Sequence, residues 1–227
     1  MKEGHNEKSV YYTKYTRRQE LARFLVQYEL FKKVLNVKGS IVECGVYKGG
    51  GVLAWAKISD ILEPYGFLRK IYGFDTFNGF PSVEPIDTFG EIAKDISKIG
   101  YLNPNYDVIG ELNEIIQNYN SERLLNHQDK ITLIKGDATK TIPEFVNNNP
   151  HLLISLLYLD FDIYAPTVSA IENFISRMPK GAIIAFDELN DAKFPGETVA
   201  LLDCLNVNKY KLEHFPWEPH ISFITIE

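Results

Sequence analysis

Acidic side chains recur along this chain where short apolar runs end. They are Glu43, Asp75, Asp137, Asp160 and the neighbouring pair Asp187 and Glu188. A single acid in such a place is commonly a solvated strand end or a helix cap. A row of acids at one edge of a sheet would destabilise the fold by mutual repulsion unless ligands or cations use them. We therefore expect these positions to form one site.

The segment IVECGVYKGGG places a glycine-rich loop directly after the first of these runs. It lacks the GKS or GKT ending of a Walker loop, and its G-x-x-x-G spacing differs from the dinucleotide fingerprint G-x-G-x-x-G. Glu43, two residues before Gly45, would repel a pyrophosphate but would suit a cationic group. S-adenosylmethionine carries an ammonium and a sulfonium and no phosphate. The loop therefore favours this cofactor over NAD or ATP.

The elements that position these residues are short apolar runs that alternate with helical patterns. Strands are expected at residues 40–44, 70–74, 130–136, 152–160 and 181–188, and two more strands joined by a turn follow them. This alternation predicts an α/β fold with a doubly wound sheet, mostly parallel with an antiparallel C-terminal strand. Ligands of such sheets bind at the carboxyl ends of the strands. There Asp75 is placed to accept hydrogen bonds from ribose hydroxyls, and Asp137 with Ala138 is placed to meet an adenine edge.

Composition narrows the class of protein. The chain has 227 residues, 45% of them hydrophobic, which suffices for one domain with additions. Its net charge of −6 argues against a general nucleic-acid binder. The two cysteines, Cys44 and Cys204, show no metal-binding spacing, and no window approaches a membrane span. We expect a soluble, cytoplasmic protein that acts on a small molecule, binds neither nucleic acid nor membrane, and assembles as a homo-oligomer.

Several stretches together resemble the macrocin O-methyltransferase family of sugar O-methyltransferases. They are IVECGVYKGGG, IYGFDTFNGFP, IKGDATKTIPEF, YLDFDIYAPTVSAIENF, PKGAIIAFDELN and FPGETVALLDCL. The resemblance runs from about Tyr15 to Ile226. It implies a class I methyltransferase with a Rossmann-like sheet that uses S-adenosylmethionine and a divalent metal, usually Mg²⁺.

The resemblance also implies roles for individual residues. The cofactor-binding positions are Glu43, Gly45, Val46, Tyr47, Gly49, Asp75, Thr76, Phe77, Asp137 and Ala138. Asp160 matches the first acid of the family's D-x-D-x-Y element, and Asp187 with Glu188 matches its second acidic pair. The family usually has two aspartates in that pair, so Glu188 is one methylene longer. Tyr47 and Tyr164 are candidates for walls of the sugar site.

The expected domain organisation follows from the same segments. Residues 1–38 form an N-terminal arm and helix, and residues 39–227 form the methyltransferase domain. The apolar face of that helix is expected to contain Leu21, Phe24, Leu25, Tyr28, Phe31 and Leu35. Residues 78–128 are too long for a simple crossover, and such insertions are usually lids or substrate elements.

The chemistry expected of the acids is activation of a sugar hydroxyl. Because a hydroxyl is a poor nucleophile at neutral pH, it needs a base, a metal that lowers its pKa, or both. Asp160, Asp187 and Glu188 could hold Mg²⁺ through oxygen ligands, with Asp160 as the base. The separation of 187 − 160 = 27 residues is one turn, one helix and the next strand, which brings two parallel strand ends side by side. Asp162 is expected to cap the following helix.

Three alternatives stay open at this point. Asp160 could only accept a hydrogen bond beside the cofactor, with Asp187 an ordinary strand-end acid. The acceptor could be a catechol or phenol rather than a deoxysugar, which itself could be nucleotide-linked or attached to a natural product. The chain could also be a catalytically idle module that binds S-adenosylmethionine.

Overall fold

A seven-stranded sheet forms the centre of the molecule in the computed structural model, which describes residues 7–227. The strands are β1 (Ser40–Cys44), β2 (Ile71–Asp75), β3 (Ile131–Lys135), β4 (Ile154–Leu159), β5 (Ile183–Phe186), β6 (Glu213–Phe215) and β7 (Glu218–Thr225). Their order is β3-β2-β1-β4-β5-β7-β6. The first five strands pair in parallel, whereas β7 is antiparallel to both β5 and β6. The predicted mostly parallel sheet with an antiparallel C-terminal strand is confirmed.

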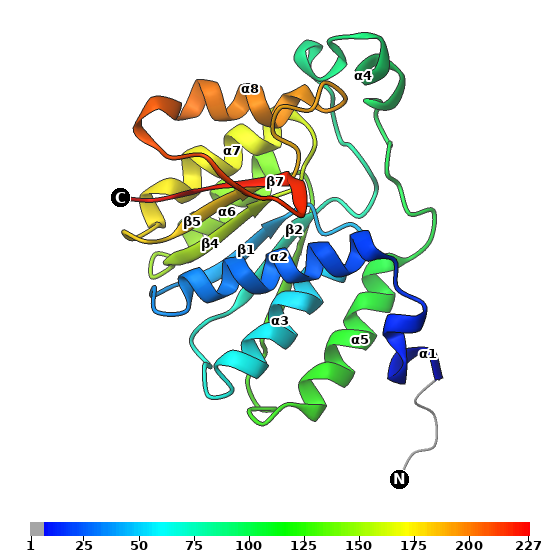
Figure 1. The fold of residues 1–227 in the computed structure, drawn as a ribbon, viewed down its shortest axis with the longest axis vertical. Coiled ribbons are helices and arrows are strands. Elements are labelled where there is room, and N and C mark those ends of the chain that lie inside the picture. Colours follow the sequence, from blue (N-terminus) through cyan, green and yellow to red (C-terminus); the bar gives the residue numbers. More distant parts are fainter. Residues whose placement is uncertain (1–6) are drawn as a thin grey trace.

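Helices cover both faces of the sheet (Figure 1). They are α1 (Glu7–Val10), α2 (Arg18–Val34), α3 (Gly50–Leu62), α4 (Glu91–Ile96), α5 (Val108–Glu122), α6 (Ala138–Asn148), α7 (Tyr164–Phe174) and α8 (Pro195–Cys204). Successive strand residues point to opposite faces. Ile41 belongs to an apolar core that also contains residues of α2, α3 and α5, while Val42 belongs to a second core that contains residues of α6, α7 and α8. The two apolar cores explain why the central strands β1 and β4 are buried at every position.

The strand order reverses between β1 and β4. In an open α/β sheet, the crevice beyond the carboxyl ends at such a point is where ligands bind. The backbone N–H of Asp160 donates to the carbonyl of Cys44 at 2.8 Å, and the N–H of Asp187 donates to the carbonyl of Leu159 at 2.9 Å. The ends of β1, β4 and β5 therefore lie side by side, as the spacing predicted.

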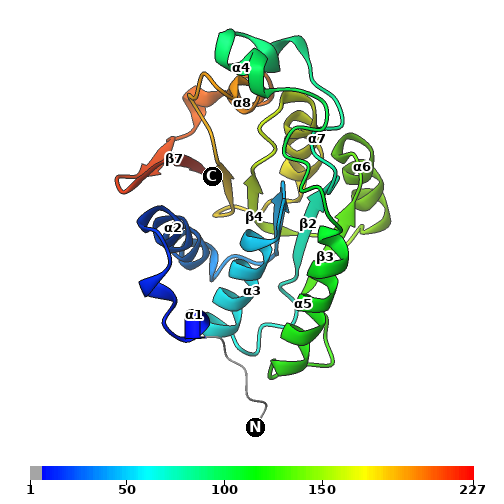
Figure 2. The ribbon, with the colours of Figure 1, turned by 90° about the vertical axis from the view of Figure 1, so that its right-hand side faces the viewer.

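Helix α2 packs on the sheet face that also carries α3 (Figure 2). The predicted apolar face is confirmed in part, because Phe31 is buried and Tyr28 and Leu35 pack partly buried against the core. Phe24 and Leu25 are exposed, whereas the helix buries Ala22, Val26, Gln27, Leu30, Phe31 and Val34. Apolar residues surround much of this helix, so steps of three and four residues describe more than one stripe. The tertiary contacts with α3, β4 and β7 select the stripe that is buried.

The long segment between β2 and β3 divides into two parts. Helix α5 buries Leu112 and Ile116 against the core, so it acts as the crossover helix of this unit. The part before it contains the short 3-10 helix η2 (Pro85–Thr88) and α4, and both views place α4 beyond the carboxyl end of the sheet, near α8 (Figures 1 and 2). A lid role for this part stays a prediction. Within the described residues, no helix is both long and apolar enough to cross a membrane.

Candidate active site

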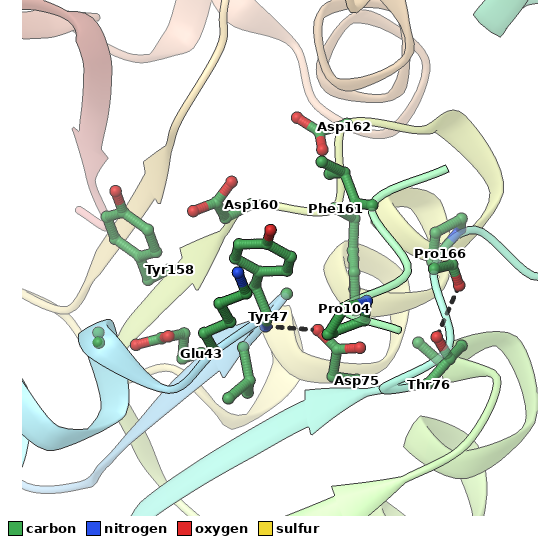
Figure 3. A pocket seen from close by; sticks show the side chains of 18 of the residues that line it. Glu43, Tyr47, Asp75, Thr76, Pro104, Tyr158, Asp160, Phe161, Asp162 and Pro166 are labelled. Carbon is green, nitrogen blue, oxygen red and sulfur yellow. Dashed lines mark hydrogen bonds between the residues drawn. The ribbon is translucent and has the colours of Figure 1, made fainter. Parts of the chain in front are cut away.

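A cavity of about 520 Å³ opens at the carboxyl ends of β1, β2 and β4. In Figure 3, Glu43, Tyr158 and Asp160 lie toward one end of it, and Asp75 and Thr76 toward the other. The predicted site residues that line the cavity are Glu43, Gly45, Val46, Tyr47, Asp75, Thr76, Ala138 and Asp160. The structure thus brings most of the predicted cofactor positions to one place, together with Asp160.

The glycine-rich loop between β1 and α3 passes in contact with the end of β4. Gly45 has a φ of +94°, and a Cβ there would lie 1.8 Å from the carbonyl oxygen of Asp160. Only glycine tolerates both conditions. A Cβ on Gly51 would lie 2.3 Å from a carboxylate oxygen of Glu43. Gly45 therefore lets the loop approach Asp160 closely, and Gly51 lets the first turn of α3 approach Glu43.

Asp75 holds this loop in its unusual conformation. Its Oδ2 accepts the backbone N–H of Tyr47 at 2.7 Å, and its Oδ1 accepts the N–H of Phe77 at 2.6 Å. Tyr47 and Phe77 have φ values of 50° and 54°, a region that non-glycine residues rarely adopt. Asp75 therefore fixes the backbone of the loop that contains Tyr47 and of the segment that follows β2.

Glu43 is a buried acid that faces the cavity. It is 3% exposed, and its Oε2 is buried without a hydrogen-bond partner among the described residues. Burial raises the pKa of Glu43 to about 8. An unpartnered carboxylate is costly to bury, and a cationic group placed against it would relieve that cost.

Asp137 is engaged differently from the sequence expectation. Its carboxylate caps α6, where it accepts the backbone N–H of Thr139 at 3.0 Å and the Thr139 hydroxyl at 2.7 Å. Its neighbours Gly136 and Ala138 line the cavity. The backbone around Asp137 thus meets the cavity, and direct contact of its carboxylate with a ligand stays a prediction.

Five acids meet around the ends of β4 and β5, and we call this group the acidic centre. Its members are Asp160, Asp162, Asp187, Glu188 and Glu197. Burial, and next the charge of Asp187, raise the pKa of Asp160 well above its ordinary value. Burial raises the pKa of Glu188 to about 7. Burial and mutual repulsion therefore disfavour the ionised carboxylates of the acidic centre.

Arg23 of α2 reaches into the acidic centre. Its guanidinium forms a close ion pair with Oδ2 of Asp187, and its Nη1 lies 3.6 Å from Oδ2 of Asp160. The Tyr158 hydroxyl donates to the other oxygen of Asp187 at 2.6 Å. Both oxygens of Asp187 are thus occupied by groups of the chain itself. Arg23 was not among the predicted site residues, because it lies on a helix that is remote in sequence.

Glu197, in the first turn of α8, connects the two acid-bearing loops. It is fully buried, and its Oε1 accepts the backbone N–H groups of Phe161 at 3.1 Å and Asp162 at 3.4 Å. Its Oε2 accepts the N–H of Glu188 at 3.3 Å. Burial and the charges of Asp162 and Asp187 raise its pKa well above the ordinary value. The sequence pattern does not single out Glu197 as a site residue, because acids are common in the first turn of a helix.

The predicted capping role of Asp162 is wrong. Asp162 has a φ of 64°, is buried and lines the cavity, and α7 has no capping hydrogen bond from its own N-cap residue, Ile163. Instead, Asp87 of η2 accepts the backbone N–H of Tyr164 at 2.7 Å. An acid 77 residues earlier in the chain thus satisfies this helix terminus.

The two predicted sugar-site tyrosines lie in different places. Tyr47 lines the cavity, is 42% exposed, and has the Lys48 ammonium 5.1 Å from its ring centre. Tyr164 donates its hydroxyl to Asp203 of α8 at 2.9 Å and is not part of the cavity lining. Phe77, Gly49, Asp187 and Glu188 also lie behind the lining rather than in it.

The acidic centre matches Mg²⁺ in its donor chemistry. All its donors are carboxylate oxygens, the ligands that Mg²⁺ prefers, and Oε2 of Glu188 is buried without a hydrogen-bond partner among the described residues. As arranged, however, no three acidic, histidine or cysteine side chains within residues 7–227 are grouped to hold a metal. Arg23 occupies Asp187 and lies against Asp160, so a metal would have to take its place.

Comparison with known proteins decides the family. The profile of the macrocin-O-methyltransferase (TylF) family matches residues 16–201. The chain belongs to this family. The family membership predicted from the sequence motifs is therefore confirmed.

Individual relatives support the same assignment. The chain is 32% identical to CalS11, a calicheamicin methyltransferase, with a TM-score of 0.90 over 96% of this chain and 84% of that one. An apo structure of CalS11, described as a TDP-rhamnose 3′-O-methyltransferase, is 28% identical with a TM-score of 0.82 over 96% of this chain and 85% of that one. The O-methyltransferase NovP, at 18% identity, has a TM-score of 0.65 over 90% of this chain and 79% of that one, which shows the fold alone. The predicted class I methyltransferase fold is confirmed.

A curated relative from Streptomyces olivaceus is 25% identical over 155 residues, or 67% of this chain. It is 8-demethyl-8-(2,3-dimethoxy-alpha-L-rhamnosyl)-tetracenomycin-C 4′-O-methyltransferase. The chain spans about half, 54%, of the length of that relative.

Proposed function

We propose that this chain is an S-adenosylmethionine-dependent O-methyltransferase that methylates a hydroxyl of a deoxysugar, either nucleotide-linked or on a glycosylated natural product. Family membership and the named activities of CalS11 and the tetracenomycin relative support this proposal. The observation that carries it is the cavity itself. One cavity at the switch point contains both Glu43, a buried acid whose Oε2 has no hydrogen-bond partner among the described residues, and a second acid, Asp160, with a raised pKa.

The cofactor side of the cavity is built from β1, β2 and β3. Glu43 would bind the α-ammonium of S-adenosylmethionine, which supplies the cation that its buried carboxylate lacks. Asp75 would accept hydrogen bonds from the ribose with the lone pairs that Tyr47 and Phe77 leave free. Ala138 and Gly136 would line the adenine end. These residues would hold the cofactor beside Asp160, which lines the same cavity.

Asp160 is the proposed base. In an in-line displacement the sugar oxygen forms a bond to the methyl carbon while the methyl–sulfur bond breaks, and its electron pair neutralises the sulfonium. The hydroxyl proton passes to Asp160. A carboxylate with a raised pKa holds such a proton more strongly than an ordinary aspartate does.

Mg²⁺ is the proposed assisting ion, with Asp160, Asp187 and Glu188 as its ligands. When bound, it would lower the pKa of the sugar hydroxyl. The donor chemistry of the acidic centre and the unpartnered Oε2 of Glu188 support this assignment. Tyr47 is the proposed wall for the acceptor, whereas Tyr164 lies outside the cavity lining with its hydroxyl bound to Asp203. Helix α2 and the part of the 78–128 insertion that precedes α5 would complete the acceptor side of the domain at 39–227, while residues 1–6 of the predicted 1–38 arm lie outside the described residues. A homo-oligomer and a cytoplasmic location stay predictions.

A panel of acceptors tests the proposal. The protein is incubated with S-adenosylmethionine and with sugar nucleotides, deoxysugar glycosides or catechols, each with and without Mg²⁺. The mass of each acceptor is then measured by mass spectrometry. We expect one added methyl mass on a deoxysugar acceptor, and none with Asp160→Asn. Methylation of catechols alone would favour the catechol-type alternative. Tight binding of S-adenosylmethionine without transfer to any acceptor would favour the binding module, and full activity in EDTA would remove the metal.

A further inference from the structure

The guanidinium of Arg23 lies where the proposed metal ligands converge. It pairs closely with Asp187 and lies 3.6 Å from Asp160, so one cation already bridges the two acids that end β4 and β5. Arg23 is the cation that the structure places against both carboxylates. A guanidinium suits this position, because its planar fork can contact two carboxylates at once.

Arg23 satisfies only part of the acidic centre. Five acids gather there, but the ion pairs of Arg23 reach Asp187 and Asp160, and Oε2 of Glu188 is buried without a hydrogen-bond partner among the described residues. Arg23 brings one positive charge, whereas a divalent cation brings two. The same oxygens cannot contact both at short range, because the two cations would repel each other.

We propose that Arg23 is the resident counter-ion of the acidic centre, and that Arg23 and a divalent cation compete for Asp160 and Asp187. This inference rests on the metal assignment of the proposed function. Arg23 is a positioning residue in this account: it holds the two carboxylates in place until the metal takes over that role. By linkage, each cation weakens the binding of the other by the same factor.

The competition connects the metal to the acceptor side of the cavity. Glu20, Phe24 and Gln27 lie on the same helix as Arg23 and line the cavity with it. If a metal displaced the guanidinium, the first half of α2 would lose its ion pairs with the acids that directly follow β4 and β5. The cavity lining contributed by α2 would then be held less firmly against the acidic centre.

Titration with Mn²⁺ tests the competition without any turnover. The free Mn²⁺ signal in electron paramagnetic resonance gives the dissociation constant for the wild type, Arg23→Met and Arg23→Lys, with no cofactor or acceptor present. Coupling between two sites commonly amounts to about 5-fold to 150-fold, and we expect Arg23→Met to bind Mn²⁺ more tightly within that range. Arg23→Lys keeps the positive charge but loses the planar guanidinium, so its Mn²⁺ affinity should lie between those of the wild type and Arg23→Met.

Controls separate the possible outcomes. Arg18→Met removes an exposed positive charge from the same helix and should leave Mn²⁺ affinity unchanged. Circular dichroism checks that each variant is folded. Equal or weaker Mn²⁺ binding by Arg23→Met would overturn the competition while leaving the metal assignment in place. Failure of both the wild type and Arg23→Met to bind Mn²⁺ would remove the metal from the proposed function, and the competition with it.

Discussion

Replacing Asp75 by asparagine should weaken the cofactor site more than the loss of one surface charge would. The carboxylate accepts two backbone N–H groups, from Tyr47 and Phe77, at 2.7 and 2.6 Å. An asparagine side chain has one carbonyl oxygen, and its NH₂ group cannot accept a hydrogen bond. Asp75→Asn can therefore retain one of the two hydrogen bonds but not both.

The size of the effect follows from the interaction that is lost. A hydrogen bond to a charged group contributes about 1.5–3 kcal/mol. Tyr47 and Phe77 both have positive φ, which costs a non-glycine residue about 1–2 kcal/mol. The residue that loses its hydrogen bond is therefore expected to leave this backbone conformation. We expect the free energy of unfolding to fall by about 1.5–3 kcal/mol. If the population of the binding-competent loop falls by the same free energy, the dissociation constant for S-adenosylmethionine rises roughly 10-fold to 150-fold.

Calorimetric titration with S-adenosylmethionine and urea unfolding measure the two quantities. Asp95→Asn is the matched control, because Asp95 is an exposed aspartate on α4 and its replacement changes the net charge equally. If Asp75→Asn binds the cofactor as tightly as Asp95→Asn does, then Asp75 does not organise the loop, and the reasoning is refuted.

Further predictions concern three other residues. Gly45→Ala should lower the free energy of unfolding by at least about 3 kcal/mol in urea, because its Cβ would lie 1.8 Å from the Asp160 carbonyl; a smaller loss would show that the loop can move away. Since the pKa of Glu43 is about 8 in the fold and about 4.3 when unfolded, the folded state binds the extra proton between these values, and stability falls as pH rises through that window. Glu43→Gln should make this fall shallower in urea unfolding, and an unchanged slope would contradict the assignment. Glu197→Gln turns an NH₂ group toward one of the two loops, so amide hydrogen exchange in that loop should speed up, and kcat should fall while the cofactor KM stays unchanged. The control Glu172→Gln, on the exposed face of α7, should leave hydrogen exchange and kcat unchanged.

Much of the sheet and the cofactor side could be predicted from the sequence, because local patterns carry that information. Apolar runs that end on acids fix the strands, and the register then brings the strand ends together. The glycines of the loop are readable for the same reason: Gly45 serves a contact between adjacent strands. These features depend on residues that are close in sequence or on pairings that the parallel topology dictates.

The errors have a common physical origin in contacts between distant segments. Asp162 looked like a helix cap, but Asp87 takes that role from 77 residues away. Arg23 and Glu197 complete the acidic centre from α2 and α8, and neither has a local pattern that sets it apart from an ordinary helical charge. The buried stripe of α2 was likewise chosen by its partners in the core rather than by its own periodicity.

Transfer of a labelled methyl group tests the central claim most directly. The protein is mixed with S-adenosylmethionine carrying a deuterated methyl group and with the deoxysugar acceptor selected from the panel, and both products are followed by mass spectrometry in a single turnover. The account predicts a deuterated methyl on a sugar oxygen in step with S-adenosylhomocysteine, and loss of both in Asp160→Asn while S-adenosylmethionine still binds. Transfer at the wild-type rate by Asp160→Asn would contradict the role of Asp160 as the base.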